Sequence, residues 1–181
     1  MKNIIAFSGP KNSGKSTAKK LLLQSHPNAI CLSFADPLKK CVTALFGLTD
    51  ECYDPIKKET ILPQWNVSPR QLMQTIGTDF IRDNLKTYFP QLQMSQHTFF
   101  CSIMHDTIQQ LDDNSLIIID DCRFQDEYNL IKSLNGKVIK ITRETTQDSH
   151  KSEHGTLYDH IIQNNSTIEN LKTKLKDLIF I

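Results

Sequence analysis

The stretch GPKNSGKST, Gly9–Thr17, decides how the rest of this sequence is interpreted. It matches the pattern G-x-x-x-x-G-K-[ST] at every fixed position. In that pattern Gly9 and Gly14 let backbone N–H groups turn inward around phosphate oxygens, and Lys15 places a positive charge beside them. The competing interpretation is a glycine-rich turn that matches by chance, so the flanking residues have to decide.

The residues on both sides of the motif have the periodicity that a phosphate-binding loop requires. NIIAFS before it predicts a strand, and GKSTAKKLLLQS predicts a helix with Leu21, Leu22 and Leu23 near one side. A helix that begins at the loop adds the positive end of its dipole, and the Ser16 hydroxyl is then placed to ligate Mg²⁺. We therefore expect a nucleoside triphosphate with Mg²⁺ to bind here. The candidate residues are Gly9, Lys11, Asn12, Ser13, Gly14, Lys15, Ser16 and Thr17.

Strand and helix patterns alternate along the whole chain. Further strands are predicted for AICLSF, SLIIID, KVIKIT and YDHIIQ, and helices for residues 36–46, 68–85, 98–111, 125–134 and 167–179. SLIIID is a continuous apolar run of the kind that parallel sheets bury on both faces. Together with the motif, the alternation predicts an α/β fold of the P-loop NTPase type, with about five parallel strands and helices on both faces in a three-layer α/β/α arrangement. Residues 48–67 look irregular.

Two of these helices carry clear start signals. Asp36 as N-cap and Pro37 in the first turn predict the start of a helix that Gly47 ends. Ser68 caps the other helix, and Gln71 completes a capping box with it.

The helix from Ser68 places polar side chains at three- and four-residue spacing. Arg70, Gln74, Gly77 and Thr78 are expected on one face. A glycine inside a helix costs about 1 kcal/mol relative to alanine. Gly77 therefore indicates close approach of either a ligand or a neighbouring helix.

A second chemical signal is IIIDDCRF, in which two carboxylates follow a buried strand. In P-loop proteins such a carboxylate holds Mg²⁺ or its water, and Asp121 or Asp120 could serve. The other one is expected to cap the helix that starts near Phe124. Arg123 follows the same strand, at the end where a phosphate would lie. The alternative interpretation is that Arg123 forms only a surface salt bridge.

Composition excludes several classes of protein. A chain of 181 residues with 39% hydrophobic and 23% charged residues suits one globular domain. A net charge of +1 predicts no polymeric nucleic acid and no membrane surface as partner, and no run approaches the roughly 20 apolar residues of a membrane span. The N-terminus is too briefly apolar for a secretory signal. Five scattered cysteines indicate reduced thiols, so we expect a cytoplasmic protein.

The motif HKSEHG, His150–Gly155, contains the His-x-x-Glu-His pattern of inverted zinc peptidases. A zinc site of that kind needs its histidines within a helix and a third carboxylate downstream. Gly155 disfavours a continuing helix, and Glu169 is the only glutamate after the motif. We interpret the match as chance.

A phosphate-binding loop occurs in several classes of protein, so other motifs must indicate which class this is. The sequence contains neither the Asn-Lys-x-Asp nor the Asp-x-x-Gly motif of GTPases, which favours a small-molecule kinase. A kinase with a phosphorylated acceptor needs extra cations to bring two anions together. The candidates are Arg70, Arg82, Arg123 and Arg143.

Several blocks together resemble the deoxynucleoside monophosphate kinases of bacteriophages and large DNA viruses. The blocks are SGPKNSGKST, SFADPLKK, WNVSPRQLMQTIGTDFIRDNL, IIIDDCRFQDEYNLIKSLNGKVIKITR, DSHKSEHG and DHIIQNNSTIENL. RQLMQTIGTDFIRDN is the most discriminating, because many enzymes share the P-loop. The resemblance implies a single kinase domain over 1–181, with an NMP-binding helical part at about 36–113 and a lid at about 143–156.

The resemblance also implies roles for individual residues. Lys15, Arg70, Arg123, Arg143 and Asp36 would act in catalysis, with Ser16 and Asp121 holding Mg²⁺. Asn165 and Ser166 would lie beside the adenine of ATP. The acceptor would contact Asp36, Lys39, Arg70, Gln74, Thr78, Asp79, Arg82, Asp121, Arg123, His150 and Glu153.

Two further classes remain open at this point. One is a different small-molecule kinase, of the thymidylate, dephospho-coenzyme A or phosphomevalonate type. The other is a nucleotide-binding module without transferase activity. Small-molecule nucleotides are the expected partners, in the host cytoplasm if the source is viral. The bases accepted, the sugar preference and a homodimeric state are not determined by the sequence.

Overall fold

The computed structural model describes residues 2–92, 98–144 and 157–179. The chain divides into two compact units. The first comprises Met1–Phe34 and Ile103–Ile181, and the second comprises Ala35–Ser102. Each unit has its own hydrophobic cluster.

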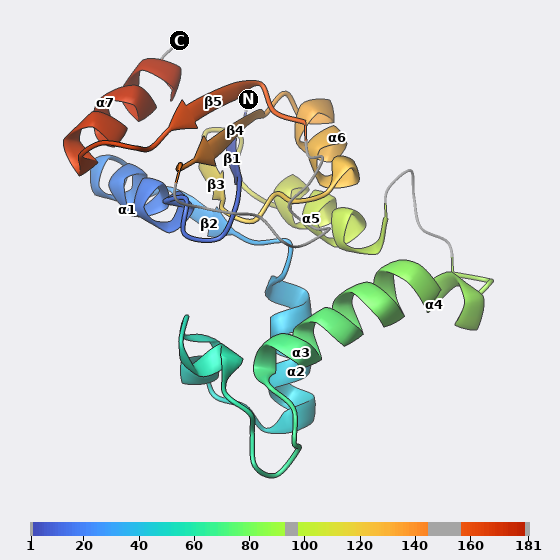
Figure 1. The fold of residues 1–181 in the computed structure, drawn as a ribbon. Helices are drawn as coiled ribbons and strands as arrows, with labels where there is room; N and C mark the ends of the chain where they lie inside the picture. Colours follow the sequence, from blue (N-terminus) through green and yellow to red (C-terminus); the bar gives the residue numbers. More distant parts are fainter. Residues whose placement is uncertain (1, 93–97, 145–156, 180–181) are drawn as a thin grey trace. The chain divides into compact units, whose positions relative to one another are not determined.

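The first unit is built on a five-stranded sheet in the order β2-β3-β1-β4-β5 (Figure 1). Every pairing is parallel, and the register places Ile5 beside Ile118 of β3 and Lys137 of β4. The predicted fold class is therefore confirmed. The strands are β1 (Asn3–Ser8), β2 (Ile30–Leu32), β3 (Leu116–Ile119), β4 (Lys137–Thr142) and β5 (His160–Gln163).

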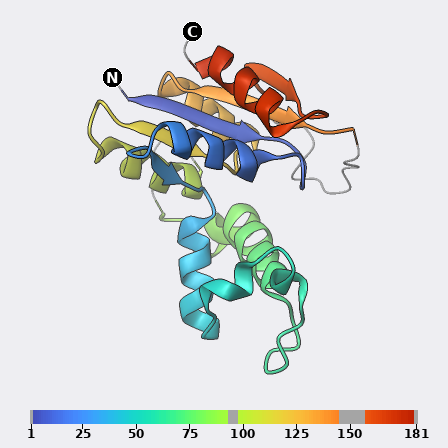
Figure 2. The same ribbon diagram turned by 90° about the vertical axis from the view of Figure 1, so that its left-hand side faces the viewer.

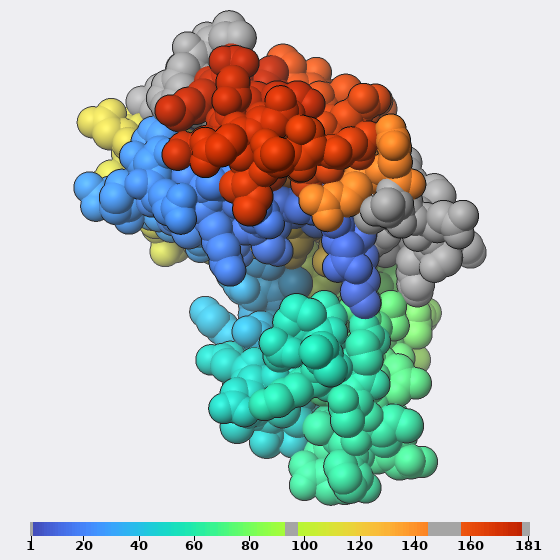
Figure 3. Space-filling view, turned by 60° about the vertical axis from the view of Figure 1, so that its left-hand side comes forward, coloured from blue at the N-terminus to red at the C-terminus, as the bar shows by residue number. Residues whose placement is uncertain are grey.

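Helices cover both faces of this sheet. Figures 1 and 2 show α1 (Lys15–Ser25) and α7 (Ile168–Ile179) on one face, with α5 (Phe99–Gln109) and α6 (Gln125–Ser133) on the other. Alternate strand residues point to opposite faces. Phe7 accordingly packs in the cluster with Leu22 of α1 and Leu171 of α7. The helices α1 and α7 lie side by side, as Figure 3 also shows.

The second unit is mainly helical. Its elements are α2 (Asp36–Phe46), the 3₁₀ turns η1 (Asp50–Tyr53) and η2 (Lys57–Glu59), α3 (Pro69–Gln74), the π-helix η3 (Thr75–Arg82) and α4 (Asp83–Tyr88). Its core contains Leu38, Val42, Leu48, Leu72 and Phe100. The region 48–67, expected to be irregular, holds two short 3₁₀ turns and an isolated bridge between Leu62 and Val67.

The helix that starts at Ser68 is only partly as predicted. The capping box is confirmed, because the Ser68 hydroxyl accepts the Gln71 N–H and the Gln71 side chain accepts the Ser68 N–H. A regular α-helix through residue 85 is wrong, since a π-helix interrupts it. Gly77 lies in this π-helix and is buried, and a Cβ there would come within 2.4 Å of the Leu38 side chain. Gly77 therefore serves close packing against α2.

Two predicted helix caps are also wrong. The N-cap of α2 is Ala35, and Asp36 is its first helical residue. At α6 neither aspartate of IIIDD caps the helix. The buried Glu127 carboxylate instead accepts the backbone N–H groups of Arg123 at 2.7 Å and Phe124 at 3.2 Å. None of the helices within the described ranges is long and apolar enough to cross a membrane.

Candidate active site

The loops at the carboxyl ends of the strands bring the predicted residues of the first unit to one edge of the sheet. The motif Gly9–Thr17 follows β1, and Asp120 and Asp121 follow β3. Arg143 follows β4, and Asn164 follows β5. In parallel α/β sheets this edge is where ligands bind.

The motif loop has a conformation that only glycine supports at two positions. Gly9 has φ +125° and Gly14 has φ +112°. A Cβ at Gly9 would lie 2.0 Å from the carbonyl oxygen of Ile141, and one at Gly14 would lie 2.3 Å from Asn164 Nδ2. Asn12 also has a positive φ of +66°. These reversals turn successive N–H groups to one side, which is the geometry of an anion-binding nest.

The Lys15 side chain folds back onto the motif loop. Its ammonium donates to the carbonyl oxygens of Gly9 and Pro10, the second at 2.6 Å. The side chain is part-buried, so the charge is held against the loop by these two acceptors. A phosphate oxygen that entered the loop would meet the ammonium already in place.

The surroundings of the loop fit a phosphate and Mg²⁺. Among the described residues, the buried hydroxyls of Ser8 and Ser13 have no hydrogen-bond partner. Buried polar groups normally have one, so these two hydroxyls beside the motif loop are exceptions. The helix α1 begins at the loop without a side-chain cap, which leaves the donors of its first turn facing it. The exposed Ser16 supplies a hydroxyl oxygen, the kind of ligand that Mg²⁺ prefers.

The two aspartates after β3 have separate partners. Asp120 forms an ion pair with Lys19 of α1. Burial works to lower the pKa of Lys19, but the hydrogen bond and charge of Asp120 outweigh it and the pKa is raised. Asp121 accepts the Ser33 hydroxyl at 2.6 Å and the Phe34 N–H at 2.9 Å. Asp121 therefore holds Ser33 and Phe34, the residues that follow β2.

Sequence reasoning named Asn165 and Ser166 after β5 but missed Asn164. Asn164 is buried, and its Nδ2 donates to the carbonyl oxygen of Ser13 at 2.8 Å. Its own carbonyl oxygen accepts Arg143 Nε at 3.0 Å. Asn165 Oδ1 accepts the Glu144 N–H at 3.0 Å. A hollow of about 210 Å³ is lined by Arg143, Glu144, Asn164, Asn165 and Ser166.

The predicted acceptor residues of the second unit are held by partners within that unit. Arg70 Nε donates to Glu59 at 2.6 Å. Lys39 lies 3.3 Å from an Asp50 oxygen and also over the Tyr53 ring.

Other predicted acceptor residues lie along the helices of the same unit. Arg82 lies over the Phe100 ring, at 5.2 Å. Asp36 begins α2, Gln74 ends α3, and both Thr78 and Asp79 are exposed on the π-helix. The helices thus carry cations and polar groups, and their role toward an acceptor stays a prediction.

Part of the predicted site lies outside the described residues. His150 and Glu153, with most of the predicted lid at about 143–156, are in this part. The zinc pattern falls there as well. Elsewhere in the chain, within the ranges that the structure describes, no group of three or more His, Cys, Asp or Glu side chains could hold a metal ion.

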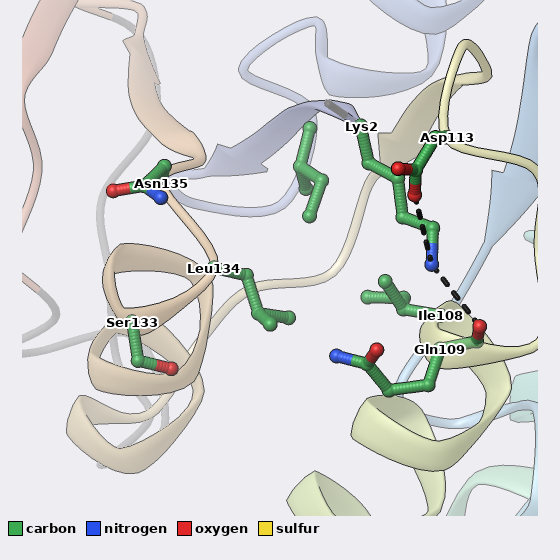
Figure 4. Close-up of a pocket in the computed structure, with 8 residues that line it drawn as sticks. Lys2, Ile108, Gln109, Asp113, Ser133, Leu134 and Asn135 are labelled. Carbon is green, nitrogen blue, oxygen red and sulfur yellow. Dashed lines mark hydrogen bonds and ion pairs between the residues drawn. The ribbon is translucent and has the colours of Figure 1, made fainter.

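A second hollow, of about 400 Å³, lies at the amino ends of the strands (Figure 4). Ile4, Ile108 and Leu134 are among its lining residues. Lys2 also lines it and donates to the carbonyl oxygen of Gln109 at 3.1 Å. None of the predicted site residues lines it, so it belongs to the edge of the sheet away from the motif loop.

Comparison with known proteins gives consistent matches. Residues 48–175 match the deoxynucleotide monophosphate kinase family. A protein of Acanthamoeba polyphaga mimivirus with the provisional name deoxynucleotide monophosphate kinase is 35% identical over 181 aligned residues, covering 95% of this chain and 93% of the relative.

Solved structures share the fold. Dephospho-CoA kinase from Campylobacter jejuni matches with a TM-score of 0.52 and 17% identity, over 99% of this chain and 96% of that one. TT1252 from Thermus thermophilus matches with a TM-score of 0.50 and 15% identity, over 98% and 96%. At such identities the likeness concerns the fold alone.

Proposed function

The chain belongs to the deoxynucleotide monophosphate kinase family, and we propose that it transfers the γ-phosphoryl group of ATP to a deoxynucleoside monophosphate. The products are ADP and the deoxynucleoside diphosphate, which places the reaction in the supply of DNA precursors. At the coarser level the family makes it a nucleotide kinase, a phosphotransferase. The observation that carries the proposal is the motif loop, with its two positive-φ glycines around the Lys15 ammonium.

Phosphoryl transfer depends mainly on positioning of the two substrates and on neutralisation of their charge. An acceptor phosphate oxygen attacks the γ-phosphorus, and the bond to the bridging oxygen of ADP breaks. No general base is needed, because a phosphate monoester is largely ionised at neutral pH. Lys15 would offset charge on the β- and γ-phosphates, and Arg123 and Arg143 lie at the same edge of the sheet for the transferring group.

Mg²⁺ would neutralise charge between the β- and γ-phosphates when bound. Ser16 and an aspartate of the pair Asp120 and Asp121 would hold it, directly or through water. Both carboxylates already have partners, Lys19 for Asp120 and Ser33 with Phe34 for Asp121. Through Lys19, Asp120 is paired with α1, the helix that begins at Lys15 of the motif.

The acceptor side is proposed for the second unit. Arg70, Gln74, Thr78, Asp79 and Arg82 lie within 13 residues of one another on consecutive helical elements. An arginine is suited to a phosphate because its planar guanidinium offers paired donors. Asp36 and Lys39 of α2 belong to the same unit and would face the acceptor nucleoside.

A screen of acceptors tests the proposed function. Release of ADP from ATP and Mg²⁺ is measured by a coupled assay with the four deoxynucleoside monophosphates, their ribonucleotide counterparts, dephospho-coenzyme A and phosphomevalonate. We expect at least one deoxynucleoside monophosphate to stimulate release well above the rate with water. Stimulation by dephospho-coenzyme A or phosphomevalonate alone would assign a different kinase. ATP binding without any acceptor-dependent release would indicate a non-catalytic module.

Arg70→Ala tests the acceptor side. Removing one charged donor to a phosphate costs about 1.5–3 kcal/mol. We therefore expect the acceptor KM to rise by about 10–100-fold at a nearly unchanged ATP KM. Glu59→Gln is the matched control, because it removes the ion-pair partner of Arg70 and keeps the guanidinium. A parallel rise of both KM values in Arg70→Ala would contradict the placement.

A further inference from the structure

We propose that Asn164 is a positioning residue that holds the motif loop in the conformation that receives the triphosphate. The inference rests on the proposed function and adds to it a residue that lies outside the motif. The sequence separation between Asn164 and its partner Ser13 is 151 residues.

Asn164 ties three parts of the sheet edge together. Its side-chain Nδ2 donates to the Ser13 carbonyl oxygen at 2.8 Å, its backbone N–H donates to Thr142 at 2.7 Å, and its carbonyl oxygen accepts Arg143 Nε at 3.0 Å. The first contact reaches the loop after β1, and the other two reach the end of β4. The residue itself is 6% exposed, and Ser13 is 0% exposed. Breaking a hydrogen bond in such a setting is costly in free energy, because it leaves a buried carbonyl oxygen without a partner.

The same side chain supports the unusual backbone of Gly14. Its amide nitrogen lies only 2.3 Å from the place where a Gly14 Cβ would be. The amide therefore packs directly on the backbone whose φ is +112°. Gly14 precedes Lys15, so the support acts where the loop turns into α1 and where the charge on the phosphates is offset.

The chemical identity of the side chain is required for this role. A carbonyl oxygen must be met by a donor, and asparagine offers an N–H₂ group on a short stem. An aspartate of the same shape would place a carboxylate oxygen against the Ser13 carbonyl oxygen, and the two acceptors would repel. The neighbour Asn165 differs, since it is exposed and accepts the Glu144 N–H. Of these two asparagines, Asn164 is therefore the one whose side chain holds the motif loop.

Asn164→Asp is the deciding variant, with Asn129→Asp as its matched control. Asn129 is an exposed asparagine of α6 whose Oδ1 accepts Gln125 Nε2, a contact that aspartate keeps. Two measurements are made on the full chain: the affinity for AMP-PNP with Mg²⁺ by calorimetry, and the backbone amide resonances of Ser13, Gly14 and Lys15 by ¹⁵N NMR. We expect Asn164→Asp to lower the affinity at least tenfold and to shift those resonances, and Asn129→Asp to change neither.

Each outcome decides the proposal. Unchanged motif-loop resonances in Asn164→Asp overturn it, whether or not the affinity falls. Shifted resonances at unchanged affinity overturn it too, because the loop would then not depend on Asn164 for binding. If Asn164→Asp does not fold, Asn164→Ala is measured in its place, since it removes the donor without adding a charge. If the wild-type chain does not bind AMP-PNP, the proposed function fails, and the resonances still report whether Asn164 positions the loop.

Discussion

Lys15→Ala lowers acceptor-dependent ADP release by about 10²–10³-fold, the loss that follows removal of one preorganised group facing developing charge. The structure gives the reason for preorganisation. The ammonium is already drawn into the loop by the carbonyl oxygens of Gly9 and Pro10, so little reorganisation is needed when phosphate arrives. Turnover is measured with the acceptor identified by the screen, at saturating ATP and acceptor.

The fold survives this change because alanine is a strong helix former and Lys15 is the first residue of α1. Lys20→Ala is the matched control, since Lys20 lies on the same helix and is exposed. It should keep wild-type turnover and wild-type far-UV circular dichroism. Turnover of Lys15→Ala within about threefold of the wild type would show that the loop does not hold the donor phosphates.

Local patterns predicted the architecture because they report on burial. The apolar run before Asp120 is buried on both faces in β3, and Ile117, Ile118 and Ile119 are each 0% exposed. Continuous apolar strands that alternate with helices are typical of a parallel sheet between two helical layers, which is the basis on which the three-layer arrangement was predicted. The motif and the Ser68–Gln71 capping box could be predicted for a similar reason, as each depends on neighbours in the sequence.

The errors arose where distant residues compete for a side chain that a local rule had assigned. One of Asp120 and Asp121 was expected to cap the next helix, yet Lys19 pairs with Asp120, and Ser33 and Phe34 supply the donors to Asp121 from far along the chain. The Glu127 carboxylate instead accepts hydrogen bonds from the backbone N–H groups of Arg123 and Phe124 at the start of α6. The π-helix is a further case, because its presence coincides with the close packing of Gly77 on Leu38, which local spacing does not encode.

Asn164 shows the same limit within the candidate site. Its sequence context, a polar segment between a strand and a helix, is typical of an ordinary loop. Only the parallel pairing of β4 with β5 and of β1 with β4 brings it to the Ser13 carbonyl oxygen. The available signal was its position directly after a predicted strand of a parallel sheet, where carboxyl ends meet at one edge.

Gly9→Ala destabilises the first unit by about 2–5 kcal/mol, the sum of a strained φ and an overpacked contact. The added Cβ would lie 2.0 Å from the carbonyl oxygen of Ile141, a buried residue of β4, which lies between β1 and β5 in the sheet. A flexible side chain could move aside, but a carbonyl oxygen in a strand can do so only if the strand itself shifts. The free energy of unfolding is measured in urea, followed by circular dichroism, because the single tryptophan, Trp65, is in the second unit.

Gly47→Ala separates backbone strain from the clash. Gly47 also has a positive φ, +63°, but a Cβ there would meet nothing within 4 Å. Its replacement should cost about 1–2 kcal/mol, the price of a left-handed conformation alone. If Gly9→Ala were no more destabilising than Gly47→Ala, the motif loop could move away from β4, and the fixed cradle proposed for the triphosphate would not exist. A larger loss in Gly9→Ala, together with loss of AMP-PNP binding, follows from a loop whose backbone is pressed directly on the sheet.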